Sequence, residues 1–210
     1  MGCVCNTDSK NETIRNDILE KLKRAQITKA YNFDKMGLRS LKCLDLVAQE
    51  RDINVFSARE NNLNNLPRNF FEKINKIIKL DLEFNSFIIM EDFIFDKNTL
   101  NTINFAHNSI DHIPKSICKL MNLKELYLSN NSIATIGNHV EFLGLTSLEM
   151  IDVSHNSLIH FPVILLSLQK LNVIKLNNNL IEKVPDEEWI DSKVKCLDIS
   201  FNKLSNVTKG

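Results

Sequence analysis

Cysteine and histidine are the side chains of this 210-residue chain best suited to metal binding or nucleophilic chemistry, and there are five of each. The cysteines are odd in number and mostly far apart, which favours reduced thiols over a disulfide framework or a Cys-x-x-Cys zinc site. The chain also has no glycine-rich phosphate loop, no G-x-S-x-G and no H-E-x-x-H motif. We therefore expect no catalytic residues, no metal and no cofactor. The cysteines are Cys3, Cys5, Cys43, Cys118 and Cys196.

The first six residues, MGCVCN, are typical of a lipid attachment site. Gly2 becomes the terminal residue once methionine is removed, as N-myristoylation requires, although Asn6 replaces the usual Ser or Thr. Cys3 and Cys5 lie where thiols can be palmitoylated, and a single myristoyl chain needs such a second signal for stable attachment. We expect residues 1–8 to be a flexible lipidation segment that holds the protein peripherally at a cytoplasmic membrane face. The alternative is an unmodified N-terminus.

Composition places the chain among ordinary globular proteins and argues against a nucleic-acid partner. Apolar residues make up 43% of the chain and charged residues 25%, which is the usual balance of a folded domain. The 26 basic residues equal the 26 acidic ones, so the chain has no overall positive charge to neutralise phosphates. No run of apolar residues approaches the roughly 20 needed to span a bilayer.

One pattern recurs through most of the chain. It reads LNTINFAHNSI from Leu100, LKELYLSNNSI from Leu123, LEMIDVSHNSL from Leu148 and LNVIKLNNNLI from Leu171, with weaker copies on both sides. The asparagines that align follow one another at 24, 23, 23, 25, 23 and 23 residues, a period typical of a solenoid. An eighth, degenerate copy precedes them, with Met36 in place of asparagine. The seven asparagines are Asn61, Asn85, Asn108, Asn131, Asn156, Asn179 and Asn202.

The spacing within each copy has a physical reason. Alternating leucines predict a short strand with one face in the core and the other face in solvent. A sharp turn follows the strand, and an inward-pointing asparagine can satisfy the buried amides of that turn as both donor and acceptor. Every proline lies six residues after a repeat asparagine, on a return limb where no strand hydrogen bond is lost. The prolines are Pro67, Pro114, Pro162 and Pro185.

These motifs resemble the cytosolic leucine-rich-repeat family with 23-residue units. The resemblance implies an α/β fold: a right-handed horseshoe solenoid with a parallel sheet on its concave side and 3₁₀ or helical turns on its convex side. We expect about eight repeats over residues 28–210, and a longer convex loop in the 25-residue unit that contains Gly137 and Gly144.

Residues 9–27 are expected to form a helix that covers the first coil. Ser9 and Glu12 have the spacing of a capping box, and Ile14, Ile18, Leu22 and Ala25 lie on one helical stripe. A solenoid needs such a cap because each terminal coil exposes an apolar face and a strand edge. At the other end we find no recognisable cap and expect lysines to keep that edge soluble; the alternative is that a partner docks there. The lysines are Lys193, Lys195, Lys203 and Lys209.

The two histidines that precede repeat asparagines, His107 and His155, could be read as paired metal ligands. They are two coils apart, or about 10 Å at the spacing of paired strands, and no ligand lies in the equivalent position between them. We therefore expect surface histidines.

The remaining candidate site is the outward face of the concave strands, whose residues are not needed for the core. Aromatic residues and methionine are typical of interface anchors, and Tyr127 with three aspartates predicts an aromatic and acidic strip for a basic or amphipathic protein segment. We expect a monomeric, non-catalytic scaffold without a small-molecule substrate; the alternative is a soluble regulatory or substrate-recognition subunit of a phosphatase or ubiquitin ligase complex. The expected binding residues are Asp81, Phe84, Asn104, His107, Tyr127, Met150, Asp152, His155, Lys175, Asp198 and Phe201, with Ser57, Arg59 and Glu83 on the same face.

Overall fold

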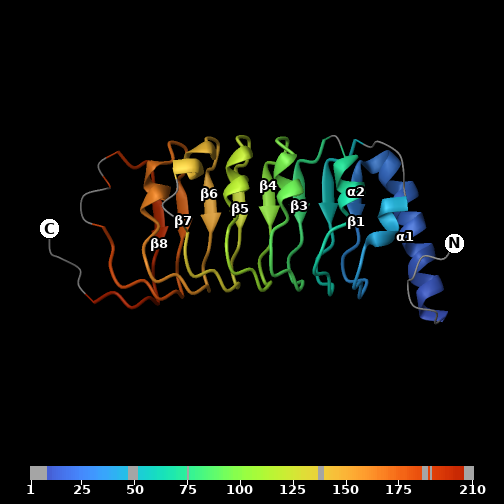
Figure 1. Ribbon diagram of the computed structural model, residues 1–210, viewed down its shortest axis with the longest axis horizontal. Coiled ribbons are helices and arrows are strands. Elements are labelled where there is room, and N and C mark those ends of the chain that lie inside the picture. Colours follow the sequence, from blue (N-terminus) through green and yellow to red (C-terminus); the bar gives the residue numbers. More distant parts are fainter. Residues whose placement is uncertain are drawn as a thin grey trace.

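Eight short strands form one parallel sheet, in which each strand pairs with the next one along the chain (Figure 1). The computed structural model describes residues 9–46, 52–74, 76–136, 140–185, 189 and 191–205. The strands are β1 (Ala30–Asn32), β2 (Val55–Ser57), β3 (Lys79–Asp81), β4 (Thr102–Asn104), β5 (Glu125–Tyr127), β6 (Met150–Asp152), β7 (Val173–Lys175) and β8 (Cys196–Asp198). The expected solenoid with a parallel sheet is confirmed.

The middle residue of each strand points into the core. In β5 this residue is Leu126, which is fully buried and aligned with Ile103 and Ile151 in the neighbouring strands. The first and third residues of the strands point to the other face, as the alternation predicts. One continuous core therefore runs along the whole array, since each coil buries its apolar side chains against the next.

Short helical turns lie on the side opposite the sheet (Figure 1). They are η1 (Lys42–Leu46), α2 (Arg68–Glu72), η2 (Asp92–Asp96), η3 (Lys115–Lys119), η4 (Val140–Gly144) and η5 (Val163–Ser167), and all but α2 are 3₁₀ helices. Pro67, Pro114 and Pro162 each directly precede one of these turns. Proline suits that position because its missing N–H has no intrahelical partner there.

Helix α1 (Ser9–Thr28) covers the first strand and closes that end of the core (Figure 1). Ile18, Leu22 and Ala25 are buried, and Ile14 packs against them. This is the helical stripe that the sequence predicts. Among the described residues, no helix is both long and apolar enough to cross a bilayer.

The repeat asparagines bond adjacent coils to each other. The side-chain oxygen of Asn131 accepts the backbone N–H of Ile110 at 2.9 Å, and its nitrogen donates to the Phe105 carbonyl at 2.9 Å. The same nitrogen donates to the Leu128 carbonyl within its own coil at 3.0 Å. The same three bonds recur at the other six repeat asparagines, so these side chains form a ladder through the turns.

Candidate functional site

The outward face of the sheet carries the residues that the sequence singles out, in two parallel rows. The third strand positions align Asn104 with Tyr127, Tyr127 with Asp152, and so on to the last strand. Met150 belongs to the row formed by the first strand positions, between Glu125 and Val173. The structure therefore brings the predicted strand residues onto one face. Those at the third strand positions are Asp81, Asn104, Tyr127, Asp152, Lys175 and Asp198.

Two of the three aspartates are not available as an exposed acidic strip, which corrects the sequence-based expectation. Asp81 is 4% exposed and lies 3.6 Å from the Lys79 ammonium and 3.9 Å from the Arg59 guanidinium. Burial raises the pKa of Asp81, and the backbone N–H of Glu83 and these two cations only partly offset that effect. Its charge is compensated within the protein.

Asp152 is buried in a similar way. It is 8% exposed, accepts hydrogen bonds from the backbone and hydroxyl of Ser154 at 3.0 and 2.6 Å, and lies 3.6 Å from the Lys175 ammonium. Lys175 thus compensates the carboxylate that we expected to attract a basic partner. The sequence alone does not show which cation reaches which carboxylate, so it could not predict that these aspartates are compensated.

Asp198 and Tyr127 remain accessible on this face. Hydrogen bonds from the hydroxyl and backbone of Ser200 lower the pKa of Asp198, whose carboxylate keeps its charge. Partial burial and the nearby Glu125 raise the pKa of Tyr127, so its phenol stays protonated and can donate a hydrogen bond. Tyr127 therefore offers both a ring and a hydroxyl at the middle of the sheet.

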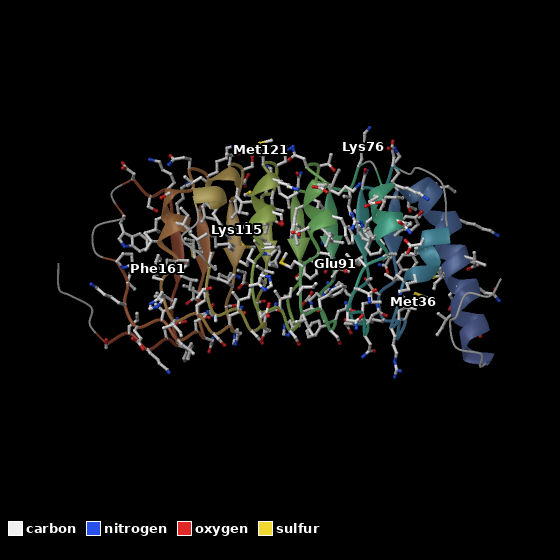
Figure 2. All side chains as sticks on the ribbon, in the orientation of Figure 1. Met36, Lys76, Glu91, Lys115, Met121 and Phe161 are labelled. Carbon is white, nitrogen blue, oxygen red and sulfur yellow. The ribbon has the colours of Figure 1, made fainter. Side chains whose placement is uncertain are left out.

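A third row borders the sheet at the carboxyl ends of the strands, and all its members have a left-handed backbone. We call it the turn row: Glu60, Phe84, His107, Asn130, His155, Asn178 and Phe201, with φ between 52° and 55°. It lies on the rim marked by Met36 in Figure 2, across the sheet from Lys76 and Met121. The backbone ladder continues into this row, for example from the His107 N–H to the Ser129 carbonyl at 2.8 Å.

The residue type that directly precedes each repeat asparagine is a signal for this left-handed turn. Asparagine tolerates a left-handed backbone and phenylalanine does not, so Asn130 and Asn178 suit the turn, whereas Phe84 and Phe201 are strained there. Phe201 is 80% exposed and Phe84 is 43% exposed. Neither the backbone nor the core accounts for these two rings, which makes them the clearest candidate contact residues.

Neighbouring members of the turn row contact one another. The Phe84 and His107 rings stack with their centroids 3.9 Å apart and their planes 14° from parallel. The Asn130 and Asn178 side-chain nitrogens lie 3.3 Å from the Nε2 atoms of His107 and His155. Phe84, His107 and Asn130 thus contact one another in sequence along the rim, as do His155 and Asn178.

The structure does not bring His107 and His155 together as ligands. Within the described part of the chain, no group of three His, Cys, Asp or Glu side chains could hold a metal ion. The lipidation candidates Gly2, Cys3 and Cys5 lie outside the described residues.

Comparisons with known proteins support the fold. Residues 98–158 match the family model described as leucine rich repeat. Among curated proteins, 55 residues, or 26% of this chain, are 38% identical to a segment of an adenylate cyclase from Schizosaccharomyces pombe. That segment is 3% of the cyclase, so the likeness covers about two to three coils and carries nothing about cyclase activity.

Solved structures show the same architecture over more of the chain. An internalin from Listeria monocytogenes has a TM-score of 0.64 at 20% identity and covers 80% of this chain and 46% of its own. A Leptospira interrogans leucine-rich-repeat protein has a TM-score of 0.57 at 20% identity; the match covers 78% of this chain and 52% of that protein. TLR13 in its complex with ssRNA13 has a TM-score of 0.61 at 23% identity; the match covers 70% of this chain and 22% of TLR13. The chain thus spans about half or less of these structures, and they show a leucine-rich-repeat fold.

Proposed function

We propose that this leucine-rich-repeat protein is a non-catalytic scaffold that binds a protein partner on the concave face of the sheet and its turn row. The single observation that carries the proposal is the presence of Phe84 and Phe201 at left-handed positions where asparagine is less strained. Strained residues persist where the structure has a use for them, and exposed aromatic rings are the usual anchors of interfaces.

The charges of the face indicate what kind of partner segment fits. Asp81 and Asp152 are compensated by Lys79, Arg59 and Lys175, so they give little net attraction for a strongly basic segment. Tyr127, Met150 and the rings of the turn row are available for apolar contacts on this face. An amphipathic segment with a few apolar side chains therefore fits this face better than a highly charged one.

The test compares variants of opposite faces in cells. Phe84→Asn with Phe201→Asn removes both rings while leaving a residue that suits the backbone, and Tyr127→Phe removes only the hydroxyl. The matched control, Met121→Ser, removes an exposed apolar side chain from the other side of the solenoid. A tagged protein should lose its specific co-purifying partner with the double variant and keep it with Met121→Ser; the reverse result rules out this face.

We further propose that the protein is held at a cytoplasmic membrane face by acylation of Gly2, Cys3 and Cys5. The support is the MGCVCN sequence and a resemblance to leucine-rich repeat-containing protein 57, a small protein for which a lipid anchor is expected. The resemblance rests on a Gly2 terminus, a short helix and then RAQITKAYNFDKMGLRSL from Arg24. Gly2→Ala should move the protein from membranes to the soluble fraction, and Cys3→Ser with Cys5→Ser should leave weak attachment with an association constant of about 10⁴ M⁻¹. A wild-type protein found wholly in the soluble fraction of eukaryotic cells would instead favour a soluble subunit of an enzyme complex.

A further inference from the structure

Helix α1 has a second apolar surface that the solenoid does not cover. Leu19 and Ile27 are 48% and 87% exposed, whereas Ile18 and Leu22 on the neighbouring stripe are buried. Lys23 lies between them, and residues four apart in a helix lie above one another on one line. Leu19, Lys23 and Ile27 therefore form one outward ridge.

The part of the ridge after Glu20 lies in a basic segment of the chain. Residues 21–33 contain four basic side chains and no acidic one, although the whole protein has no net charge. Lys21 is used by the fold, since its ammonium donates to the Asn32 carbonyl at 2.7 Å. Lys23 and Lys29 are exposed, and Arg24 has only a solvent-exposed partner, Glu20, at 3.8 Å.

Helix stability does not account for this composition. Basic side chains stabilise a helix when they lie in its last turn, near the negative end of the dipole. The last turn of α1 has no basic residue and instead has Ile27 in solvent. The charges of Lys23 and Lys29 and the exposed Ile27 thus have no role in the stability of α1 that these contacts or the helix dipole would explain.

We infer that the outward face of α1 binds an anionic phospholipid surface. Helices that lie in a membrane interface combine exposed apolar side chains with lysine and arginine, which are attracted to anionic headgroups. A protein groove is a poorer match, because it would bury Lys23 between the two apolar anchors without a partner. At a membrane the same lysine extends its ammonium to the headgroups while its stem lies among apolar groups.

This surface lies at the end of the solenoid and leaves the concave sheet free (Figure 1). A partner on the sheet and a membrane at α1 can therefore be bound together. The inference stands apart from acylation of Gly2, since it rests on residues of α1 alone, and the two can be tested separately.

The experiment uses the full chain made in bacteria without a myristoyltransferase, so that no acyl group is present. Sedimentation with vesicles compares pure phosphatidylcholine with a mixture containing about one third phosphatidylserine, at low and at physiological salt. We expect at least about tenfold stronger partitioning to the anionic vesicles and a loss of it with salt. Lys23→Gln with Arg24→Gln should weaken it by about fivefold for each charge, and Leu19→Ser with Ile27→Ser should abolish it.

A control variant removes one exposed positive charge and one exposed apolar side chain at and just after turn η3, away from α1. Lys115→Gln with Met121→Ser should bind vesicles as the wild type does, and all variants should keep its melting temperature. Equal partitioning to neutral and anionic vesicles, or binding unaffected by the α1 variants, overturns the inference. A myristoylated protein that binds both vesicles equally while the bacterial protein binds neither supports the acyl anchor and overturns the role of α1.

Discussion

Each repeat asparagine satisfies backbone groups in two coils, which no apolar residue can do. Asn131→Leu leaves the Ile110 N–H without its partner and removes one of the two amide donors to the Phe105 carbonyl, which keeps the bond from Asn108. Asn156→Leu likewise leaves the Ile133 N–H without its partner and removes one of the two amide donors to the Leu128 carbonyl. We expect each variant to lower the free energy of unfolding by about 1 to 3 kcal/mol in denaturant titrations. The control is Asn122→Leu. The exposed Asn122 amide bonds only Asn98 in a loop, so this variant should change stability by less than about 0.5 kcal/mol.

The turn row predicts a substitution that raises stability and reduces binding. Phe201→Asn places a residue that tolerates a left-handed backbone at φ 54°, and we expect a gain of about 1 kcal/mol in the free energy of unfolding. Asn178→Phe is the reverse change at the equivalent position of the preceding coil and should lower stability by a similar amount. Thermal melts of the two variants should therefore shift in opposite directions, and a shift in the same direction refutes the role assigned to the left-handed turn.

Asp81 and Asp198 hold equivalent strand positions, but their pKa values are shifted in opposite directions. Burial raises the pKa of Asp81 in the folded protein, so the folded state holds its proton more tightly than the unfolded chain, and stability falls as pH rises from about 4. The Ser200 hydrogen bonds lower the pKa of Asp198, so its contribution is present above about pH 4 and is lost as pH falls.

Melting temperatures between about pH 3 and pH 6 should show this contrast through the matched variants Asp81→Asn and Asp198→Asn. Relative to Asp81→Asn, the wild type should gain stability as pH falls. Relative to Asp198→Asn, it should lose stability as pH falls, by a smaller amount because Asp198 is more exposed. Parallel pH profiles of the two variants would contradict the assignment of burial as the dominant effect at Asp81.

At the scale of the elements, the convex turns pack so closely that one glycine is required for space. A Cβ atom at Gly144 would lie 2.5 Å from the Cys118 carbonyl oxygen of the neighbouring turn η3, and this backbone cannot move aside easily. Gly37 is different: it has φ 64° and open space around it, so asparagine can replace it. We expect Gly144→Asn to lower the free energy of unfolding by about 1 to 3 kcal/mol and Gly37→Asn by less than about 1 kcal/mol in denaturant titrations.

The sequence was sufficient to predict the elements and their order because both depend on local spacing. The period-two leucines set the buried face of each strand, and the asparagines set its register, so Leu126 aligns with Ile103 and Ile151. The charge compensation of Asp81 and Asp152 depends instead on which nearby cation reaches each carboxylate. Such a contact between side chains follows from packing and has no signature in the spacing of the sequence.

At the scale of the whole molecule, each coil is stabilised mainly by its neighbours, so protection should vary along the array. Leu126 and Leu128 in the middle are fully buried, whereas Leu197 and Ile199 at the last described strand are only partly buried. The first strand differs from the last because α1 covers it. Amide hydrogen exchange should therefore be slowest in β4 to β6, somewhat faster in β1 and fastest in β8.

A variant of the cap distinguishes this nearest-neighbour stabilisation from all-or-none unfolding. Leu22→Ser removes a buried apolar side chain of α1 and weakens its contact with β1, which should raise exchange in β1 and β2. The amides of β6 lie several coils away and depend on β5 and β7, so their exchange through local opening should remain unchanged. If Leu22→Ser accelerates exchange equally in every strand, the solenoid opens as one cooperative unit, and α1 stabilises all the coils rather than only those it contacts.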